Sequence, residues 1–349
     1  MKKIKKAVVL VLAICLALSL APASVFAENS EPYKYTITPE SKDWANYKTY
    51  ELIELTNIPD SIVEDLDTAT LVSTVMEYPF LGDIYAFENT DIGIQVVSER
   101  FSGLKELLGR SDAGNNLYKE FSSMKSEVAA LSNVANVDYK TVMKHKIMGT
   151  LLSQPDIFKQ LNQEQINSIV GSSSTISEKL SVTPIYAADE SPFATAARYL
   201  TAYVYTPEGS AVQVLIRGEE LTSADKTAMN NYMASLHPNA TRLRTATTNY
   251  NCHSYAWYST STSNKYWMND PSAYMSDGSY TEVGFTPTAA GQKMYYPVPG
   301  GHSAIVYTPS SDIWDVMLTS KWGPYGLYRH YYGDDPYGNG ALNIKCWER

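Results

Sequence analysis

The sequence predicts a multidomain protein in which an all-α helical domain precedes an α+β domain, and three observations support this fold class. The chain has 349 residues, more than one hydrophobic core usually serves. Apolar residues recur at helical spacing over residues 58–170, whereas short apolar runs between turn residues fill residues 193–349. Between them, residues 171–192 are polar and contain Pro184, so we expect a linker there.

The N-terminus has the pattern of a secretory signal. Four lysines precede the apolar run of residues 7–20, and Val25-Phe26-Ala27 offers a cleavage site for a signal peptidase. We predict a signal peptide over residues 1–27 and an extended segment over residues 28–57. The protein is then secreted, and extracellular or associated with the cell wall. No later stretch is long and apolar enough for stable membrane insertion.

The charge of the chain disfavours some classes of partner. Its formal net charge is −9, and removal of a leader with four lysines and no acids makes this roughly −13. Nucleic acid and anionic membranes are therefore not expected partners. We expect no cofactor, and the sequence gives no indication of the oligomeric state.

Helical patterns follow one another in the first domain. The clearest covers residues 68–77, where Leu71, Val72, Val75 and Met76 form one apolar stripe. The pattern leaves two roles open for this domain, a scaffold and an intramolecular cover for the second domain. Further helices are expected over residues 101–108, 116–131, 138–152, 155–161 and 163–169.

Strand and turn signals mark the second domain. Residues 199–205 and 211–217 predict a hairpin around a Pro-Glu-Gly turn. A helix is expected over residues 222–234 because threonine and serine precede it as capping residues. Residues 291–296 predict another strand, and the apolar run behind His302 predicts its hairpin partner.

Cys252 is the residue that indicates most about function. It lies in Asn249-Tyr250-Asn251-Cys252-His253-Ser254-Tyr255-Ala256-Trp257, where asparagines of the capping type break a strand and a helix begins. A helix N-terminus stabilises the thiolate, the nucleophilic form of cysteine. We therefore predict that Cys252 is a catalytic nucleophile. Two alternatives stay open, a small buried hydrophobe on a packed helix and one half of a disulfide with Cys346.

A thiol nucleophile needs a base, and His302 is the candidate. Gly300-Gly301 leaves open space beside it, and a histidine at the start of a strand can face a thiol on a neighbouring helix. A third group must accept a hydrogen bond from the other ring nitrogen, and either Ser320 or His330 on the following strands can do so. We interpret the remaining histidines as structural. They are His145, which is expected to lie in solvent, His237 and His253.

Tyrosine and tryptophan are frequent in the second domain. Their broad apolar faces suit a groove for a sugar or a peptide, and core packing is the equally open alternative. The candidate substrate-binding residues are Trp257, Trp322 and, beside the thiol, Asn251.

The order of these residues resembles that of the NlpC-type and CHAP-type papain-like hydrolases of bacterial cell walls. The shared order is a cysteine on a helix, a histidine opening a strand after a glycine-rich turn, and a polar residue on the next strand. More narrowly, three strings look like an uncharacterised group of secreted bacterial proteins at the edge of that superfamily. They are Asn251-Cys252-His253-Ser254-Tyr255-Ala256-Trp257, His302-Ser303-Ala304-Ile305-Val306 and Ser320-Lys321-Trp322-Gly323.

This resemblance covers about residues 199–349 and implies a papain-like fold for them. It implies Cys252 as the nucleophile, His302 as the base and a third polar residue near Ser320. The string Tyr78-Pro79-Phe80-Leu81-Gly82-Asp83 in the helical domain looks like a module of secreted proteins from Gram-positive bacteria.

The predicted function is therefore a secreted cysteine hydrolase that cleaves amide bonds. Cell-wall peptides of peptidoglycan are the substrate that secretion and the resemblance imply. One alternative is a non-catalytic secreted binding module that retains the fold. Another is a zinc site made of Cys252, His302 and His330, but their wide spacing lacks a C-x-x-C signature, and we predict no metal site.

Overall fold

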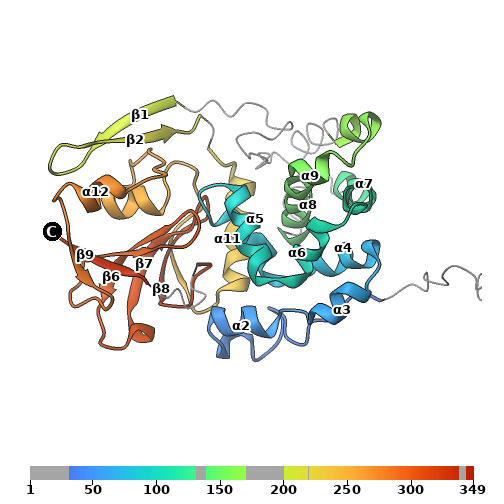
Figure 1. Ribbon diagram of the computed structural model, residues 1–349, viewed down its shortest axis with the longest axis horizontal. Coiled ribbons are helices and arrows are strands. Elements are labelled where there is room, and N and C mark those ends of the chain that lie inside the picture. The colour runs from blue at the N-terminus through green and yellow to red at the C-terminus, as the bar shows by residue number, and fades with distance from the viewer. Residues whose placement is uncertain (1–30, 131–138, 170–199, 219, 338–342) are drawn as a thin grey trace, which may run out of the picture.

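A computed structural model describes residues 31–130, 139–169, 200–218, 220–337 and 343–349 (Figure 1). Helices of the N-terminal half lie beside an antiparallel sheet of the C-terminal half, and this confirms the expected α+β content. The predicted signal peptide and linker, residues 1–27 and 171–192, lie outside the described residues. None of the helices in the described part has both the length and the apolarity needed to cross a membrane.

Helices are the regular secondary structure of the N-terminal half, as far as it is described. Residues 31–57, expected to be extended, instead contain two helices, η1 (Trp44–Asn46) and α2 (Thr49–Leu55). The helical half continues with α3 (Asp60–Asp65), α4 (Thr68–Met76), η2 (Pro79–Tyr85), α5 (Thr90–Arg100), α6 (Ser102–Gly109), α7 (Ala113–Ala130), α8 (Tyr139–Leu152), α9 (Pro155–Phe158) and a last helix over residues 163–169.

Side-chain caps fix where two of these helices begin. The Asp67 side chain accepts a hydrogen bond from the backbone N–H of Thr70 at the start of α4, and Asn89 does the same for Ile92 in α5. The helices predicted near residues 68–77, 101–108, 116–131, 138–152, 155–161 and 163–169 are confirmed, whereas α5 was not among the predictions.

Seven antiparallel strands form the main sheet of the C-terminal half. Their spatial order is β3-β8-β7-β6-β5-β9-β4, so neighbours in the sheet are often distant in the chain. The predicted hairpin forms a separate two-stranded sheet of β1 (Leu200–Tyr205) and β2 (Ala211–Ile216). The main strands are β3 (Thr241–Arg244), β4 (Thr281–Gly284), β5 (Lys293–Tyr296), β6 (His302–Thr308), β7 (Met317–Lys321), β8 (Leu327–Tyr331) and β9 (Lys345–Glu348).

Helix α11 (Ser223–Leu236) joins the two halves. The shorter helices described elsewhere in the second half are η4 (Ser254–Tyr258), α12 (Ser272–Ser276) and η5 (Ile313–Asp315). As predicted, a threonine cap opens α11: Thr222 and Asp225 form a reciprocal capping box. Figure 1 shows α11 between the sheet and the helices of the first half, where it contacts α8. The buried ammonium of Lys146 on α8 lies 2.7 Å from the Asp225 carboxylate.

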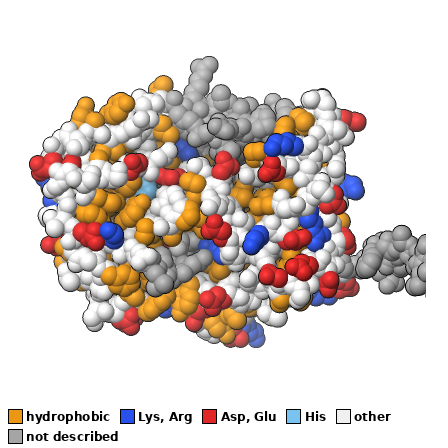
Figure 2. All heavy atoms as spheres, viewed as in Figure 1, with side chains coloured by type: hydrophobic (Ala, Val, Ile, Leu, Met, Phe, Trp, Pro, Cys, Tyr) orange, Lys and Arg blue, Asp and Glu red, His pale blue; other side chains and the backbone are white. Residues whose placement is uncertain are grey.

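One hydrophobic cluster extends through both halves. It contains Leu71 and Leu151 from the helices together with Met294, Val306 and Leu318 from the sheet. On the face seen in Figure 2, hydrophobic side chains gather over the sheet half, between scattered acidic groups. His145 is buried against Phe121 in this structure, so its expected position in solvent is wrong.

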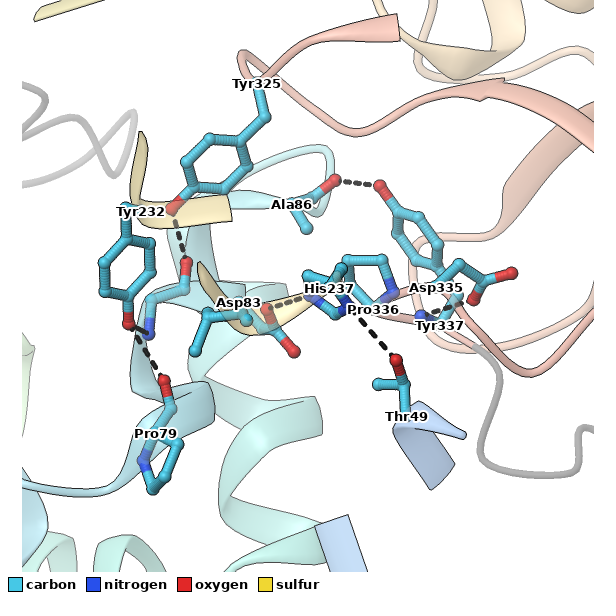
Figure 3. Close-up of polar contacts among 12 residues, drawn as sticks. Thr49, Pro79, Asp83, Ala86, Tyr232, His237, Tyr325, Asp335, Pro336 and Tyr337 are labelled. Carbon is cyan, nitrogen blue, oxygen red and sulfur yellow. Dashed lines mark hydrogen bonds and ion pairs between the residues drawn. The ribbon is translucent and has the colours of Figure 1, made fainter. Parts of the chain in front are cut away.

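Polar contacts also join the halves around η2 (Figure 3). The Tyr325 hydroxyl donates to the carbonyl oxygen of Gly82, at 2.8 Å. Asp83 binds Arg100 at 2.7 Å, and its other oxygen lies 3.5 Å from His237 Nε2. The other ring nitrogen of His237 is 3.0 Å from the Thr49 hydroxyl, which fits its structural interpretation.

Candidate functional site

Cys252 opens a short helical segment, residues 252–258, whose last five residues form the π-helical turn η4 (Ser254–Tyr258). Asn251 caps this segment because its side-chain oxygen accepts hydrogen bonds from the N–H groups of Ser254 and Met268. Its amide nitrogen donates to the Met268 carbonyl at 2.6 Å. The thiol therefore lies at a helix N-terminus, the position that the sequence indicated.

The surroundings of the Cys252 sulfur favour its neutral form. The side chain is buried, and burial raises its pKa to about 12, with a smaller contribution from the charge of Glu88. Hydrogen bonds from the backbone N–H groups of Ser303 and His253, and the charge of Lys321, act in the opposite direction. At neutral pH the thiol is therefore protonated in this conformation.

His302 is the first residue of β6, and β6 pairs with β5 so that His302 lies opposite Tyr296. Its ring stacks on Tyr337 with centroids 3.6 Å apart and meets Tyr296 edge-on at 5.2 Å. Burial, with smaller effects from His253 and His330, lowers its pKa well below the usual value. Neither ring nitrogen has a hydrogen-bond partner within the described residues, so the neutral imidazole is unengaged.

The side chains of His302 and Ser303, at the start of β6, face different sides of the strand. The Ser303 hydroxyl lies 2.8 Å from both His253 Nδ1 and Trp257 Nε1, so Ser303 faces the helical segment that carries Cys252. Side chains alternate along a strand, and His302 therefore shares the opposite face with Ala304, which packs in the cluster beneath the helical half. His302 is followed directly along β6 by Ser303, whose backbone N–H contacts the Cys252 sulfur.

Ser320 and His330 bind each other and not His302. The Ser320 hydroxyl lies 2.8 Å from His330 Nε2 and accepts a hydrogen bond from Trp322 Nε1 at 2.9 Å. His330 Nδ1 lies 3.0 Å from the Tyr331 carbonyl oxygen, which accepts its proton. The indole and the carbonyl thus direct the serine proton toward Nε2, and neither candidate orients the His302 ring.

The three candidate substrate-binding side chains are buried in this structure. Trp257 donates to Ser303, Trp322 stacks on Tyr328 at 4.0 Å, and the Asn251 side chain is engaged as a cap. They pack and position the site in this conformation, and do not line an open groove.

Lys321 is a further buried charge near the thiol. Its ammonium donates to three backbone carbonyl groups, those of Thr247, Gly323 and Tyr325, at 2.5–3.0 Å. Burial lowers its pKa to about 7, while the three acceptors use every proton of the charged form. Lys321 therefore fixes the loop beside the site and does not serve as the third catalytic group.

Two groups that the sequence did not indicate lie next to the site. The Glu88 carboxylate, from the loop before α5, lies 3.8 Å from His253 Nε2 and has one oxygen without a hydrogen-bond partner. Burial raises the Glu88 pKa to about 8, with a smaller contribution from Asp270, and burial lowers that of His253 to about 4. The second group, Tyr337, stacks on His302 from 35 residues further along the chain.

The alternatives for Cys252 can be compared with this geometry. Cys252 and Cys346 are both free, and the Cys346 thiol lies 3.4 Å from the carbonyl oxygen of Phe285. Across the ranges that the structure describes, no three histidine, cysteine or acidic side chains are grouped to hold a metal ion. The zinc alternative therefore has no support in the geometry, whereas a nucleophile and a buried structural thiol both remain compatible with it.

The arrangement offers a protonated thiol at a helix start and, at the start of β6, a neutral imidazole without a hydrogen-bond partner among the described residues. Such a pair is chemically suited to acyl transfer once the two groups meet and the proton can move between them. No protein-family model, curated protein or solved structure matches the chain.

Proposed function

We propose that the chain is a secreted cysteine hydrolase that cleaves amide bonds in cell-wall peptides. Cys252 is its nucleophile and His302 its base, in a papain-like domain formed by the second half. The observation that carries this proposal is the His302 imidazole. It is fully buried, neither of its nitrogens has a hydrogen-bond partner among the described residues, and the next residue supplies a backbone N–H that contacts the thiol. Unsatisfied buried polar groups are costly and are often kept for chemistry.

The proposed reaction has two steps. The Cys252 sulfur gives its proton to His302 and attacks the substrate carbonyl carbon, while nearby backbone N–H groups hold the developing oxyanion. The carbon–nitrogen bond then breaks, His302 returns the proton to the leaving amine, and a thioester remains on Cys252. In the second step His302 takes a proton from water, and the hydroxide attacks the thioester carbon. The carbon–sulfur bond breaks, His302 returns the proton to the Cys252 sulfur, and a carboxylic acid is released.

The substrate class is supported by the predicted secretion signal and by the resemblance to wall hydrolases. The acidic chain disfavours nucleic acid as a partner. Since both reacting side chains are buried, turnover requires a conformation in which the site is open.

A non-catalytic binding module is the second candidate, and two observations favour it. Burial keeps the Cys252 thiol protonated, and strand alternation directs His302 away from the face on which the Cys252 segment packs. In that case the fold would bind the wall peptide without turnover.

Purified peptidoglycan, incubated with the chain that lacks residues 1–27, tests the proposal. We expect free amines to be released, and we expect the release to be lost in both Cys252→Ala and His302→Ala. Cys346→Ala, which removes the other buried thiol, is the matched control and should retain activity. Release that persists in Cys252→Ala would contradict the proposal. Peptidoglycan binding without release, in a sample whose Cys252 does not react selectively with iodoacetamide at neutral pH, would establish the binding module.

A further inference from the structure

We propose that residues 85–92 of the helical half form an intramolecular cover that keeps the Cys252 and His302 site closed. This inference rests on the proposed function, because a cover has a role only if the site beneath it acts. The segment joins η2 to α5 and comes from a part of the chain more than 150 residues before Cys252. It touches the second half at three places that surround the site.

The first contact involves the glycine turn in front of His302. Gly300 has a φ of +74°, and a Cβ atom there would lie 2.8 Å from Ile92 Cγ2 and 3.5 Å from Glu88 Oε2. Only glycine therefore allows the turn to pack this closely on the segment. The open space that the sequence suggested beside His302 is occupied by the helical half.

The second contact lies behind the imidazole. Tyr337, whose ring covers one face of His302, donates from its hydroxyl to the carbonyl oxygen of Ala86 (Figure 3). The ring of Phe87 meets Tyr337 edge-on at 5.2 Å. Gly323 also packs against the carbonyl oxygens of Tyr85 and Ala86, where a Cβ atom would clash. The segment thus holds the ring that covers His302.

The third contact involves the residue next to the nucleophile. Glu88 lies 3.8 Å from the ring of His253, the residue after Cys252, and its charge disfavours the thiolate. Cys252 has 4% of its surface exposed and His302 has none, so a peptide carbonyl cannot reach the sulfur in this conformation. Displacement of residues 85–92 would remove all three contacts at once.

Thiol alkylation measures this cover without requiring turnover. The chain that lacks residues 1–27 is treated with iodoacetamide, and the labelling rates of Cys252 and Cys346 are followed separately by peptide mapping. In Ile92→Ala, which removes the methyl groups packed on Gly300, we expect Cys252 labelling to accelerate by about tenfold. Cys346 is also buried, and its rate should not change.

The control is Val96→Ala on the same helix. Val96 is half-buried like Ile92 and lies one turn further from the glycine contact. The Val96→Ala substitution should leave the labelling rates of Cys252 and Cys346 as in the wild type. Equal acceleration of both thiols in Ile92→Ala would indicate general loosening and would overturn the cover, as would no acceleration.

Peptidoglycan hydrolysis by the same samples separates this inference from the proposed function. Selective labelling without Cys252-dependent hydrolysis would retain the cover and overturn the hydrolase. Wild-type hydrolysis as fast as that of Ile92→Ala would retain the hydrolase and overturn the cover.

Discussion

The His302 side chain carries the free-energy cost of burying polar atoms without hydrogen-bond partners. The rings of Tyr296 and Tyr337 enclose the imidazole, and neither of its nitrogens has a hydrogen-bond partner in the described part of the chain. Leaving a buried donor or acceptor unsatisfied costs about 1–3 kcal/mol. Ser320 and His330 lie on the same sheet, and their hydroxyl and ring nitrogens are all engaged.

Replacing Ser320 tests its structural role. In Ser320→Ala, His330 Nε2 and the indole N–H of Trp322 lose their partner, so the free energy of unfolding should fall by roughly 1–3 kcal/mol. Urea unfolding measures this change, and Ser73→Ala, at a half-buried serine of α4 whose hydroxyl, among the described residues, bonds only to the backbone of its own helix, should change it by less than about 0.5 kcal/mol. Hydrolysis by the folded Ser320→Ala protein should persist, and a loss by orders of magnitude would instead identify Ser320 as the orienting group.

Glu88 should make stability depend on pH in a definite direction. The carboxyl group has a raised pKa, about 8 against a usual 4.5, so the folded state binds more protons than the unfolded state between these values. Its contribution to stability therefore falls as pH rises through this window and levels off above it. Glu88 interacts electrostatically with four titratable groups. They are His253 and Cys252 of the helical segment 252–258, Asp270 before α12 and Tyr295 of β5.

Glu88→Gln isolates this contribution from the buried histidines, whose lowered pKa values act in the opposite sense. Unfolding of both proteins by urea at pH 5, 6, 7 and 8 gives their stability difference at each pH. We expect the wild type to lose stability relative to Glu88→Gln as the pH rises. A constant difference would show that Glu88 titrates normally.

At the level of elements, the start of α11 combines a helix cap and an ion pair in one residue. Asp225 completes the capping box with Thr222 and also pairs with the buried Lys146 of α8. Asp225→Ala leaves a buried ammonium without its carboxylate and should cost about 3–5 kcal/mol. Thr222→Ala removes only the cap and should cost about 1 kcal/mol. Equal losses in urea unfolding would show that the ion pair contributes nothing.

Local patterns predicted the elements whose boundaries are set by nearby residues. The stripe of α4, the hairpin of β1 and β2, and the cap of α11 all follow from residues within a few positions of one another. Helix α5 was missed because Gly93 interrupts its pattern. A Cβ at Gly93 would clash with the backbone of Ile84, and this is a tertiary reason for glycine.

The candidate site was predictable to the same extent. Asn251 as the cap, Cys252 at the helix start and His302 at the strand start are local features, and the structure has them. The positions of Glu88 and Tyr337 depend on contacts between distant parts of the chain, which one sequence does not reveal. The burial of Trp257 and Trp322 likewise results from how the two halves pack.

At the scale of the whole molecule, the shared core ties the two halves together. Helix residues such as Leu71 and sheet residues such as Val306 belong to one hydrophobic cluster, and α11 contacts α8. We therefore expect the chain without residues 1–27 to unfold in one calorimetric transition, with equal calorimetric and van't Hoff enthalpies. Two separate transitions, one of them retained by residues 200–349 alone, would show that the halves fold independently.

The pH profile of Cys252 alkylation tests most directly whether a nucleophile and its base lie beneath a cover. In the wild type the rate should stay low at pH 7 and rise only in alkaline solution, because burial raises the thiol pKa to about 12. In Ile92→Ala the inflection should fall below the ordinary thiol value of 9.0, because the proposed reaction requires the opened site to let the His302 imidazole pair with the thiolate. Adding His302→Ala should return the inflection to about that value. An inflection near 9.0 in Ile92→Ala, unchanged by His302→Ala, would contradict the account.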